Sequence, residues 1–382
     1  MPFSRLSLGP DLARAFRELG YARPFPVQEQ TIPALFTGQD LVVQAPTGSG
    51  KTVAFLAPLL HVLAKGSSEI IPGNPPRVLI LVPTRELAMQ VRDRARELAR
   101  HLPLPLKIRA TFGGVSVNPQ MMALRGGADL VIATPGRLLD LVRQNALNLA
   151  GLRHLVIDEA DKLLELGFSD EMNEILRLLP LKRQTLLFSA TMNTAVQEVV
   201  GAFLKAPLNI HVEGGPALAV SIDEKAYLVP QEAKGPFLRE LLARETWPQV
   251  LVFVASGRRA DNVVRKLGNN GIRALSLHGD KSQSARMDAM EQFRSVRLRV
   301  LVATDLVSRG IDISGLACVI NYDLPRSPRD YVHRAGRTGR AGMSGIAISL
   351  VGPEEEAHLA LIEKKVGRRF VKERVTPGCD QR

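Results

Sequence analysis

The chain has 382 residues, of which 45% are hydrophobic and 23% charged, a size and composition that fit two globular domains rather than one core. No apolar run is long enough to cross a bilayer, and the first residues show no export signal, so we expect a cytoplasmic protein. Lys and Arg total 50 against 38 Asp and Glu, and the net charge of +12 favours nucleic acid as a partner over an anionic membrane surface or no polyanion at all. Cys318 and Cys379 form no C-x-x-C pair, which supports neither a disulfide framework nor a zinc site.

The first informative stretch reads APTGSGKT, from Ala45 to Thr52, between an apolar run at 41–43 and a helix-like run at 53–63. A strand that turns through glycines into a helix directs backbone N–H groups and the positive end of the helix dipole at one point, which suits a phosphate. Lys51 can reach the outer phosphates, and Thr52 supplies a hydroxyl for Mg²⁺. Ala45 departs from the common P-loop pattern, which begins with Gly. A glycine-rich turn is the alternative, but the flanking strand and helix favour an ATP site formed by Pro46, Thr47, Gly48, Ser49, Gly50, Lys51 and Thr52.

Short β-branched runs alternate with amphipathic helical runs after this loop, which predicts a parallel sheet flanked by helices. The predicted strands of the first domain lie at 77–84, 129–135, 154–161 and 185–191. Residues 213–220, EGGPALAV, are small and aperiodic, and we interpret them as an interdomain linker. The alternation then resumes with QVLVFVAS, IRALSLHG, VRLRVLVATD, CVINYDL and GIAISLVG. We therefore predict a first domain at 1–212, a second domain at 221–366 without a P-loop, and a short basic tail at 367–382.

Two carboxylates, Asp158 and Glu159, follow a predicted strand at the carboxyl edge of the sheet, where open α/β sheets place ligands. A carboxylate there can hold Mg²⁺ while its neighbour positions and deprotonates an attacking water. We assign Asp158 to the metal and Glu159 to the water. A surface acidic cluster that caps the next helix is the alternative, and the P-loop upstream in the same domain favours the catalytic interpretation.

In the second domain, the stretch YVHRAGRTGR places Arg337 and Arg340 three residues apart, on one face if the segment is helical. Guanidinium groups brought to a transferring phosphoryl group stabilise the charge on its equatorial oxygens, which accelerates the reaction by about 10³–10⁵. Such a role would explain why one P-loop serves two domains. A basic patch that contacts nucleic acid is an equally supported alternative.

Together these residues resemble a known family, the DEAD-box ATP-dependent RNA helicases of helicase superfamily 2, whose name is spelled by Asp158, Glu159, Ala160 and Asp161. The resemblance covers the chain from Phe3 to about Val366, has a full series of motifs in the family's order, and is closest to the bacterial, short-tailed type. It implies two RecA-like domains in tandem, each a mostly parallel sheet flanked by helices. The family also accepts Ala at the first P-loop position.

The resemblance further implies roles around the nucleotide. In GYARPFPVQ, Gln28 would bond the adenine edge, with Tyr21 and the upstream Phe3 as the nearby aromatics, whereas the alternative is a buried Gln28 satisfied by its own backbone. Ser189 and Thr191 belong to SAT, which is similar to the motif that couples the ATP site to unwinding. Departures at Val307, Ser308 and Ala335 alter no polar catalytic group. The remaining roles implied by the resemblance are Gly310 and Asp312 near the nucleotide, His333 in the coupling network, and Arg337 and Arg340 as arginine fingers.

An RNA track is similarly implied. PTRELA, the glycine pair at 113–114 and TPGR resemble backbone contacts from the first domain, and QxxR resembles one from the second. The alternatives are a turn for the glycines, a helix start for TPGR and a solvated helical face for QxxR. Amides, hydroxyls and Arg hold phosphates and 2′-hydroxyls without reading bases, and aromatics, at 5%, are too few for a base-stacking platform. The implied RNA-binding residues are Pro83, Thr84, Arg85, Gly113, Gly114, Thr134, Pro135, Gly136, Arg137, Gln283, Arg286 and Thr304.

We therefore expect an RNA-dependent ATPase in which ATP, Mg²⁺ and RNA close the two domains, so that short RNA duplexes separate locally or RNA–protein complexes are remodelled. A monomer is the expected state, and protein partners from ribosome assembly or RNA decay both fit. Three alternatives stay open: an ATP-gated RNA clamp or scaffold with little unwinding, a DNA-directed helicase with the same core, and a small-molecule kinase, which leaves the motifs of the second domain unused.

Overall fold

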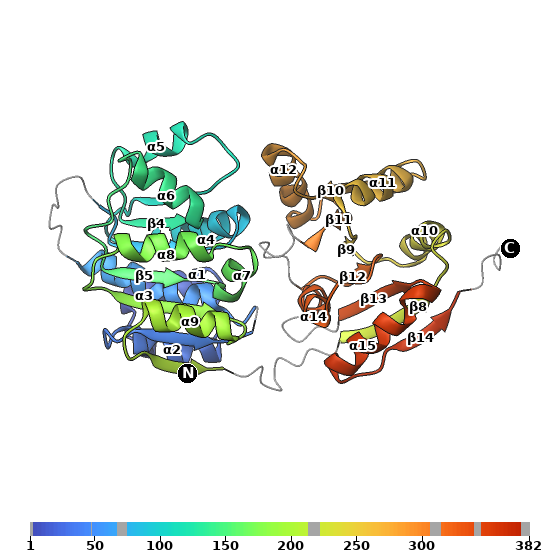
Figure 1. The fold of residues 1–382 in the computed structure, drawn as a ribbon, viewed down its shortest axis with the longest axis horizontal. Helices are drawn as coiled ribbons and strands as arrows, with labels where there is room; N and C mark the ends of the chain where they lie inside the picture. The colour runs from blue at the N-terminus through green and yellow to red at the C-terminus, as the bar shows by residue number, and fades with distance from the viewer. Residues whose placement is uncertain are drawn as a thin grey trace. The chain divides into compact units, whose positions relative to one another are not determined.

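The computed structural model describes residues 3–46, 48–66, 75–212, 222–305, 315–339 and 345–375. The chain divides into two compact units, Met1–Gly215 and Pro216–Arg382 (Figure 1). The division falls within the predicted linker at 213–220, whose residues lie outside the described ranges. No helix in those ranges has both the length and the apolar character that crossing a membrane requires.

The first unit contains a seven-stranded parallel sheet in the order β3-β4-β2-β5-β6-β1-β7. Its central strands are apolar and buried on both faces, as expected for parallel strands covered by helices on both sides. The four predicted strands are present as β2, β4, β5 and β6, whereas β3 and β7 were not predicted. The strands are β1 (Leu41–Gln44), β2 (Val78–Leu81), β3 (Ile108–Thr111), β4 (Leu130–Ala133), β5 (His154–Ile157), β6 (Gln184–Ser189) and β7 (Leu208–His211).

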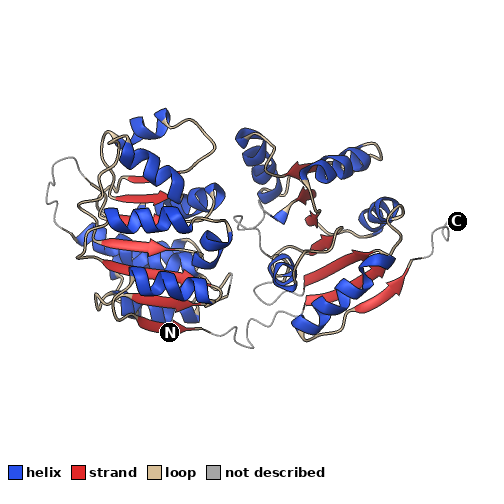
Figure 2. Cartoon of the chain, viewed as in Figure 1, coloured by secondary structure: helices blue, strands red, loops and turns tan. Residues whose placement is uncertain are grey.

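Helices cover both faces of this sheet (Figure 2). On one face, α1 to α4 pack over Val43 and Ile80, and on the other, α6 to α9 pack over Leu79 and Leu155. Successive side chains of a strand, such as Leu79 and Ile80 of β2, point to opposite faces of the sheet. Each face therefore has its own core. The helices are η1 (Phe3–Arg5), α1 (Gly9–Glu18), α2 (Pro26–Leu35), α3 (Lys51–Lys65), α4 (Arg85–Ala99), α5 (Asn118–Leu124), α6 (Pro135–Arg143), α7 (Ala160–Glu165), α8 (Ser169–Leu178) and α9 (Thr194–Phe203).

The second unit has a seven-stranded parallel sheet in the order β10-β11-β9-β12-β13-β8-β14, so each strand takes the same rank as its counterpart in the first unit. The five predicted strands are present as β9 to β13. One face packs against α10 and α11, and the other packs against α12, α14 and α15. The elements are β8 (Ile222–Leu228), α10 (Lys234–Arg244), β9 (Val250–Phe253), α11 (Gly257–Gly268), β10 (Ala274–Leu277), α12 (Gln283–Arg294), β11 (Val300–Ala303), β12 (Cys318–Asn321), α14 (Pro328–Ala335), β13 (Gly345–Val351), η3 (Pro353–Glu355), α15 (Glu356–Val366) and β14 (Val371–Arg374).

The basic end of the chain differs from the predicted tail at 367–382. Residues Val371–Arg374 form β14, which pairs in parallel with β8 and closes one edge of the second sheet. Phe370 is buried against Tyr331, with ring centroids 5.1 Å apart, and anchors the start of this strand. The four side chains of β14 are exposed and mostly charged, which is how edge strands avoid pairing with other chains. This segment therefore belongs to the second domain, and the residues from 376 onward lie outside the described ranges.

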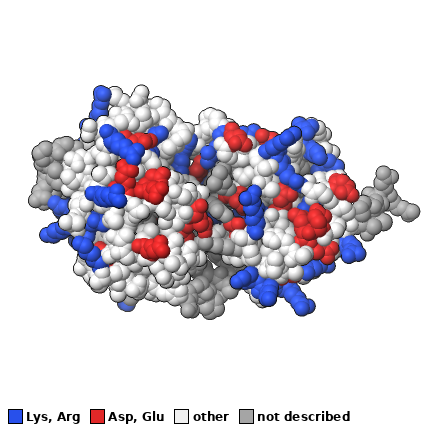
Figure 3. All heavy atoms as spheres, viewed as in Figure 1, with Lys and Arg blue, Asp and Glu red and all other residues white. Residues whose placement is uncertain are grey.

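Charged side chains of both signs are interspersed over the visible face of each unit (Figure 3). The surplus of Lys and Arg is therefore not gathered into one basic surface on that face.

Candidate functional site

The P-loop, the DEAD residues and the SAT residues follow three neighbouring strands of the first sheet. In the parallel register, Gln44 of β1 pairs with Ser189 of β6, and Leu187 of β6 pairs with Ile157 of β5. The backbone N–H of Ala45 donates to the Ser189 carbonyl at 3.1 Å, so the P-loop starts beside SAT. The predicted residues of the P-loop, DEAD and SAT stretches are thus brought to one sheet edge, where open α/β sheets bind ligands.

The P-loop needs glycine at Gly50, the residue before α3. Its φ of 90° lies in the left-handed region, and a Cβ there would approach Gln28 Nε2 within 2.5 Å and Phe25 within 2.8 Å. Ser49 donates its hydroxyl hydrogen to the Pro46 carbonyl at 2.8 Å and is buried, which fixes the loop from inside. Thr47, also assigned to the site, lies outside the described residues.

Lys51 is the first residue of α3 and is 7% exposed. Its ammonium group donates to the carbonyl oxygens of Ala45 at 2.7 Å and Pro46 at 3.2 Å. Burial lowers the pKa of Lys51, and the nearby carboxylates of Asp158 and Glu159 oppose this shift. The lysine is thus a buried cation held inside the loop by neutral carbonyl oxygens. The charged oxygens of a phosphate can take the place of these carbonyls.

Asp158 and Glu159 follow β5 directly, as the sequence predicts. Glu159 has φ 51° and ψ 50°, a left-handed conformation that costs a residue with a side chain about 1–3 kcal/mol and is typical of functional sites. Asp158 is 3% exposed, and its carboxylate accepts the Glu159 N–H at 2.9 Å. Burial and the adjacent Glu159 raise the pKa of Asp158 to about 7, against the opposing effect of Lys51. A buried carboxylate in this setting favours a bound cation.

Lys162, which was not singled out from the sequence, pairs with Glu159. Its ammonium group lies 3.0 Å from Glu159 Oε2, and its side chain is 4% exposed against 16% for Glu159. The two residues are three apart at the start of α7, where a helical turn brings such side chains together. The buried ammonium fixes the direction of the Glu159 carboxylate. The i, i+3 spacing of opposite charges was the signal available in the sequence.

The SAT residues connect β6 to the DEAD segment. The Thr191 hydroxyl donates to Asp161 Oδ2 at 3.1 Å, and the Ser189 hydroxyl donates to the Thr191 carbonyl at 2.6 Å. Ser189 and Asp161 are both buried. A displacement of the DEAD segment would therefore be passed to the loop after β6.

Gln28 is fully buried at the first turn of α2. Its side-chain oxygen accepts the Phe25 N–H at 3.0 Å, and its amide nitrogen donates to the Gly50 carbonyl at 3.1 Å. This is the arrangement that the backbone-satisfied alternative describes, and it ties α2 to the P-loop. Phe3 is also buried, stacked on Phe16 at 4.1 Å, and Tyr21 packs edge-on against both rings. The exposed aromatic beside the P-loop is Phe25, at 38%, which the sequence analysis missed although it lies within the quoted motif.

The predicted RNA residues of the first unit follow β2, β4 and β3, which are also neighbours. Arg85 donates to the Gly114 carbonyl at 3.3 Å, and the Gly113 N–H donates to the Thr134 hydroxyl at 3.4 Å. Pro83 directly precedes Thr84, which caps α4, whereas 135–137 form the first turn of α6. Arg137 is 8% exposed and donates to the Val115 carbonyl at 2.8 Å, so it holds the glycine loop in place. The structure thus brings these three segments together.

In the second unit, the predicted RNA residues follow the neighbouring strands β10 and β11. Gln283 and Arg286 lie half-buried in the first turn of α12, and the Thr304 N–H donates to the Leu277 carbonyl at 3.2 Å. Thr304 follows β11 as Thr134 follows β4, so the two threonines occupy equivalent places.

Arg337 does not lie in a helix, so the condition under which Arg337 and Arg340 would share one face is not met at Arg337. Helix α14 ends at Ala335 and is capped at Gly336, so Arg337 lies beyond it, buried, whereas His333 lies within the helix. Arg340, Gly310 and Asp312 lie outside the described residues.

Arg334, next to His333, forms a network of side-chain contacts and was missed from the sequence. It makes two hydrogen bonds to the Asp305 carboxylate, at 2.6 and 2.7 Å, and its guanidinium carbon lies 4.8 Å from the Phe253 ring centroid. It also donates to Asn321 Oδ1 at 3.0 Å and to the Asp323 carbonyl at 2.7 Å. The segment after β11, which contains Thr304, is thereby fixed to the helix that carries His333.

Known proteins resemble the chain over nearly its whole length. The DEAD/DEAH box helicase family matches residues 25–199, and the helicase conserved C-terminal domain matches residues 233–342. The chain is 37% identical over 370 residues to ATP-dependent RNA helicase CshA of Listeria monocytogenes, covering 96% of this chain and 69% of the relative. It is 39% identical over 370 residues to DEAD-box ATP-dependent RNA helicase CshA of Streptococcus pneumoniae, covering 97% and 69%.

Solved structures agree with this likeness. S. cerevisiae Dbp5 bound to RNA and ADP BeF3 has a TM-score of 0.83 and 29% identity, over 97% of this chain and 95% of that chain. A DEAD box protein from Methanococcus jannaschii has a TM-score of 0.55 and 35% identity, over 98% and 99%. The fold and the sheet-edge residues define a P-loop ATPase with two RecA-like domains in tandem. More narrowly, the chain belongs to the DEAD-box ATP-dependent RNA helicases.

The conformation of the P-loop makes Gly50 a direct test of the site. We expect Gly50→Ala to weaken ATP binding by about tenfold or more, since a left-handed residue with a Cβ costs about 1–3 kcal/mol and this Cβ also meets Gln28. Isothermal titration calorimetry with ATP measures the loss. Gly201→Ala in α9, where a Cβ meets nothing within 4 Å, is the control and should bind as the parent does. Unchanged ATP affinity in Gly50→Ala would contradict the described loop geometry.

Proposed function

We propose that the protein is a cytoplasmic, monomeric RNA-dependent ATPase whose two units close on RNA in the presence of ATP and Mg²⁺. Closure separates short RNA duplexes locally or remodels RNA–protein complexes. The supporting observation is the shared edge of the first sheet, where the nucleotide residues follow β1, β5 and β6 and the RNA residues follow β2, β3 and β4. The similar Dbp5 structure is bound to RNA and ADP BeF3, which supports both ligands for this chain.

Phosphate binding follows from the state of Lys51. Its ammonium group would exchange the carbonyl oxygens of Ala45 and Pro46 for oxygens of the outer phosphates, a charge-assisted contact at a buried position. Backbone N–H groups of the loop from Gly48 to Gly50, together with the N-terminus of α3, would hold the remaining phosphate oxygens. The loop therefore binds the nucleotide mainly through its phosphates.

The residues at this edge fit Mg²⁺. Among the described residues, no group of three or more His, Cys, Asp and Glu is arranged around a metal, but Mg²⁺ bound with a nucleotide needs only one or two protein oxygens beside phosphates and waters. The Thr52 hydroxyl and the buried Asp158 carboxylate supply that donor set. When bound, Mg²⁺ neutralises phosphate charge as the terminal phosphoryl group is transferred.

Glu159 is the residue we propose to orient and deprotonate the attacking water. It has a left-handed backbone conformation directly before α7, and Lys162 of that helix holds the carboxylate in one direction. The proton moves from water to a Glu159 carboxylate oxygen as the oxygen of that water bonds to the terminal phosphorus. The bond from this phosphorus to the oxygen that bridges it to the β-phosphate breaks, and ADP leaves with that oxygen.

Adenine would be bound beside Gln28. Each polar atom of its amide makes one hydrogen bond to the backbone, which leaves a second N–H and a second lone pair, the complementary set for the N7 and N6 edge of adenine. The exposed Phe25 ring offers an apolar wall next to it. Phe3 and Tyr21 would act indirectly, because they form the packed aromatic cluster that supports this segment.

The second unit would complete the ATP site on closure. We propose that Arg337 and Arg340 stabilise the charge of the transferring phosphoryl group, that Gly310 and Asp312 approach the nucleotide, and that His333 joins the coupling network. The Arg334–Asp305 pair would transmit RNA contact at Thr304 to these residues, because it joins their segments by two short charge-assisted bonds.

RNA would be held without base readout. The N-terminal turns of α4, α6 and α12 and the glycine loop offer amides, hydroxyls and cations that suit phosphates and 2′-hydroxyls. Ligands that contact both units favour the closed arrangement, and a strand bent on closure no longer fits an A-form duplex. The residues proposed for this contact are Pro83, Thr84, Arg85, Gly113, Gly114, Thr134, Pro135, Gly136, Arg137, Gln283, Arg286 and Thr304.

Glu159→Gln tests the proposed base, since it keeps the shape of the side chain but cannot accept the proton. We expect steady-state ATP turnover with RNA to fall by at least about 100-fold while ATP and RNA still bind together. Glu97→Gln, which breaks the exposed Arg94–Glu97 pair at the same i, i+3 spacing, is the control and should turn over at the parent rate. Normal turnover in Glu159→Gln would refute the assignment.

Lys162→Met tests whether the buried ammonium positions Glu159. A similar-sized apolar side chain should lower kcat by about tenfold or more with little change in KM for ATP, because misdirection of a reacting group affects the chemical step rather than binding. Lys162→Arg, which keeps the charge, should recover most of the rate. If Lys162→Met and the parent have the same kcat, the ion pair has no part in catalysis.

A further inference from the structure

The second unit has a counterpart of the P-loop position. Because β8 takes the rank of β1, the loop after β8 lies where the P-loop lies in the first sheet, at the carboxyl edge that suits ligands. The resemblance extends to the next helix: α3 begins at Lys51, and α10 begins at Lys234.

Lys234 is not available to a ligand. It is fully buried, and its ammonium group lies 2.6 Å from Glu355 Oε2 and 3.3 Å from the Tyr322 carbonyl. A carboxylate thus takes the place that a phosphate would take in the first unit. The second unit therefore does not bind a nucleotide in the manner of a P-loop.

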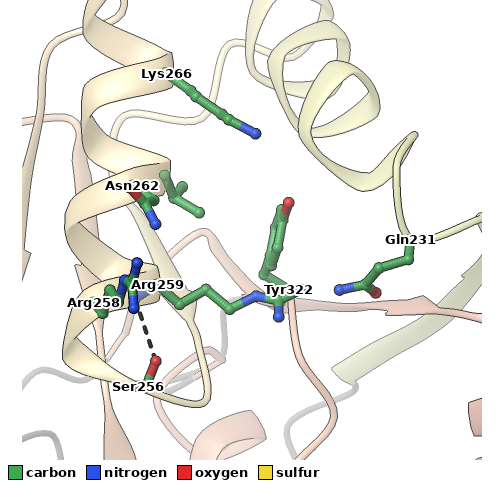
Figure 4. A pocket seen from close by; sticks show the side chains of 8 residues that line it. Gln231, Ser256, Arg258, Arg259, Asn262, Lys266 and Tyr322 are labelled. Atoms are coloured by element: carbon green, nitrogen blue, oxygen red, sulfur yellow. Dashed lines mark hydrogen bonds between the residues drawn. The ribbon is translucent and has the colours of Figure 1, made fainter.

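A different set of cations surrounds an open pocket beside this loop. The pocket has a volume of about 330 Å³ and lies between α11 and the β8–α10 loop. Figure 4 shows Lys266 and Arg259 reaching from α11 into the same space as Tyr322 and Gln231. Arg258 contributes a third cation to the lining. Cations, a phenol and an amide therefore converge there from three segments.

The pocket carries excess positive charge. Arg259 is partly neutralised, since its guanidinium lies 3.1 Å from Asp323 Oδ2 and 5.6 Å from the centroid of the Tyr322 ring. In the part of the chain that the structure describes, no carboxylate lies within ion-pair distance of Arg258 or Lys266, both of which are exposed. Two cations are thus free to pair with an anion.

We propose that this pocket binds a small phosphate ester at a site separate from the P-loop. Arg258 and Lys266 would hold the phosphate by charge-assisted hydrogen bonds. The Asn262 and Gln231 amides, which also line the pocket, would bond hydroxyl or carbonyl groups of the esterified part. The volume suits a ligand of the size of a mononucleotide.

The pocket differs in place from the proposed RNA track of the second unit. The predicted RNA residues of this unit follow β10 and β11, whereas the pocket is lined from α11, which follows β9, and from the segments after β8 and β12. RNA backbone phosphate is therefore the competing occupant that a test must distinguish.

The test starts from the full chain with the substitution Lys51→Ala, which removes the P-loop lysine. The probe is glycerol 3-phosphate at low salt. Calorimetry should detect binding, and the added pair Arg258→Gln and Lys266→Gln should weaken it by at least about tenfold. The control pair Arg294→Gln and Lys364→Gln removes the same charge from exposed positions elsewhere in the second unit and should leave binding unchanged.

Affinity for a ten-nucleotide single-stranded RNA is measured on the same proteins. Equal RNA affinity in the two double variants, with probe binding lost only in the pocket pair, supports the proposal. The proposal is overturned if the Lys51→Ala protein does not bind the probe, or if both double variants bind the probe equally well. It is also overturned if no probe binding is detected and RNA affinity falls only in the variant that lacks Arg258 and Lys266. The last outcome would assign the pocket to the RNA track.

Discussion

The parallel pairing of β5, β6 and β1 is the constraint on which the nucleotide site depends. Because Gln44 pairs with Ser189 and Ile157 with Leu187, the residues after these strands must meet at one edge. A shift of one residue in either pairing would turn the buried strand residues toward the wrong core. Both cores of the first unit therefore hold the phosphate loop and the DEAD carboxylates in position.

Buried charge gives this edge its chemistry. Lys51, Asp158 and Lys162 lie below one-tenth exposure, where electrostatic interactions are stronger than in water. Lys51 is held by carbonyl oxygens and Glu159 by Lys162, so these charges have fixed positions. Electrostatic preorganisation of this kind is usually the largest contribution to catalysis. The residues predicted to bind RNA follow the strands on the other half of the same sheet, and the bond from Thr191 to Asp161 joins the segments that follow β6 and β5.

Much of this arrangement could be predicted from the sequence, because buried parallel strands read as apolar runs and the polar residues after them must share an edge. The strands β8 and β14 were missed because their sequences, IDEKAYL and VKER, are charged rather than apolar. They form strands because they pair with each other at one edge of the sheet. The end of α14 before Arg337 and the burial of Gln28 depend on tertiary contacts that periodicity does not contain. Arg334 was missed because its partners are set by the fold, whereas the pairing of Lys162 with Glu159 could have been found from their i, i+3 spacing.

The central claim is that the nucleotide site is complete only when both units contribute and that RNA brings them together. Steady-state ATP turnover by the full chain and by the isolated first unit, residues 1–212, each with and without single-stranded RNA, tests it most directly. The account predicts that RNA raises ATP turnover by the full chain at least about tenfold. The isolated first unit, shown to be folded by circular dichroism, should turn over ATP slowly and at the same rate with and without RNA. Turnover by the isolated unit as fast as that of the full chain with RNA would contradict it.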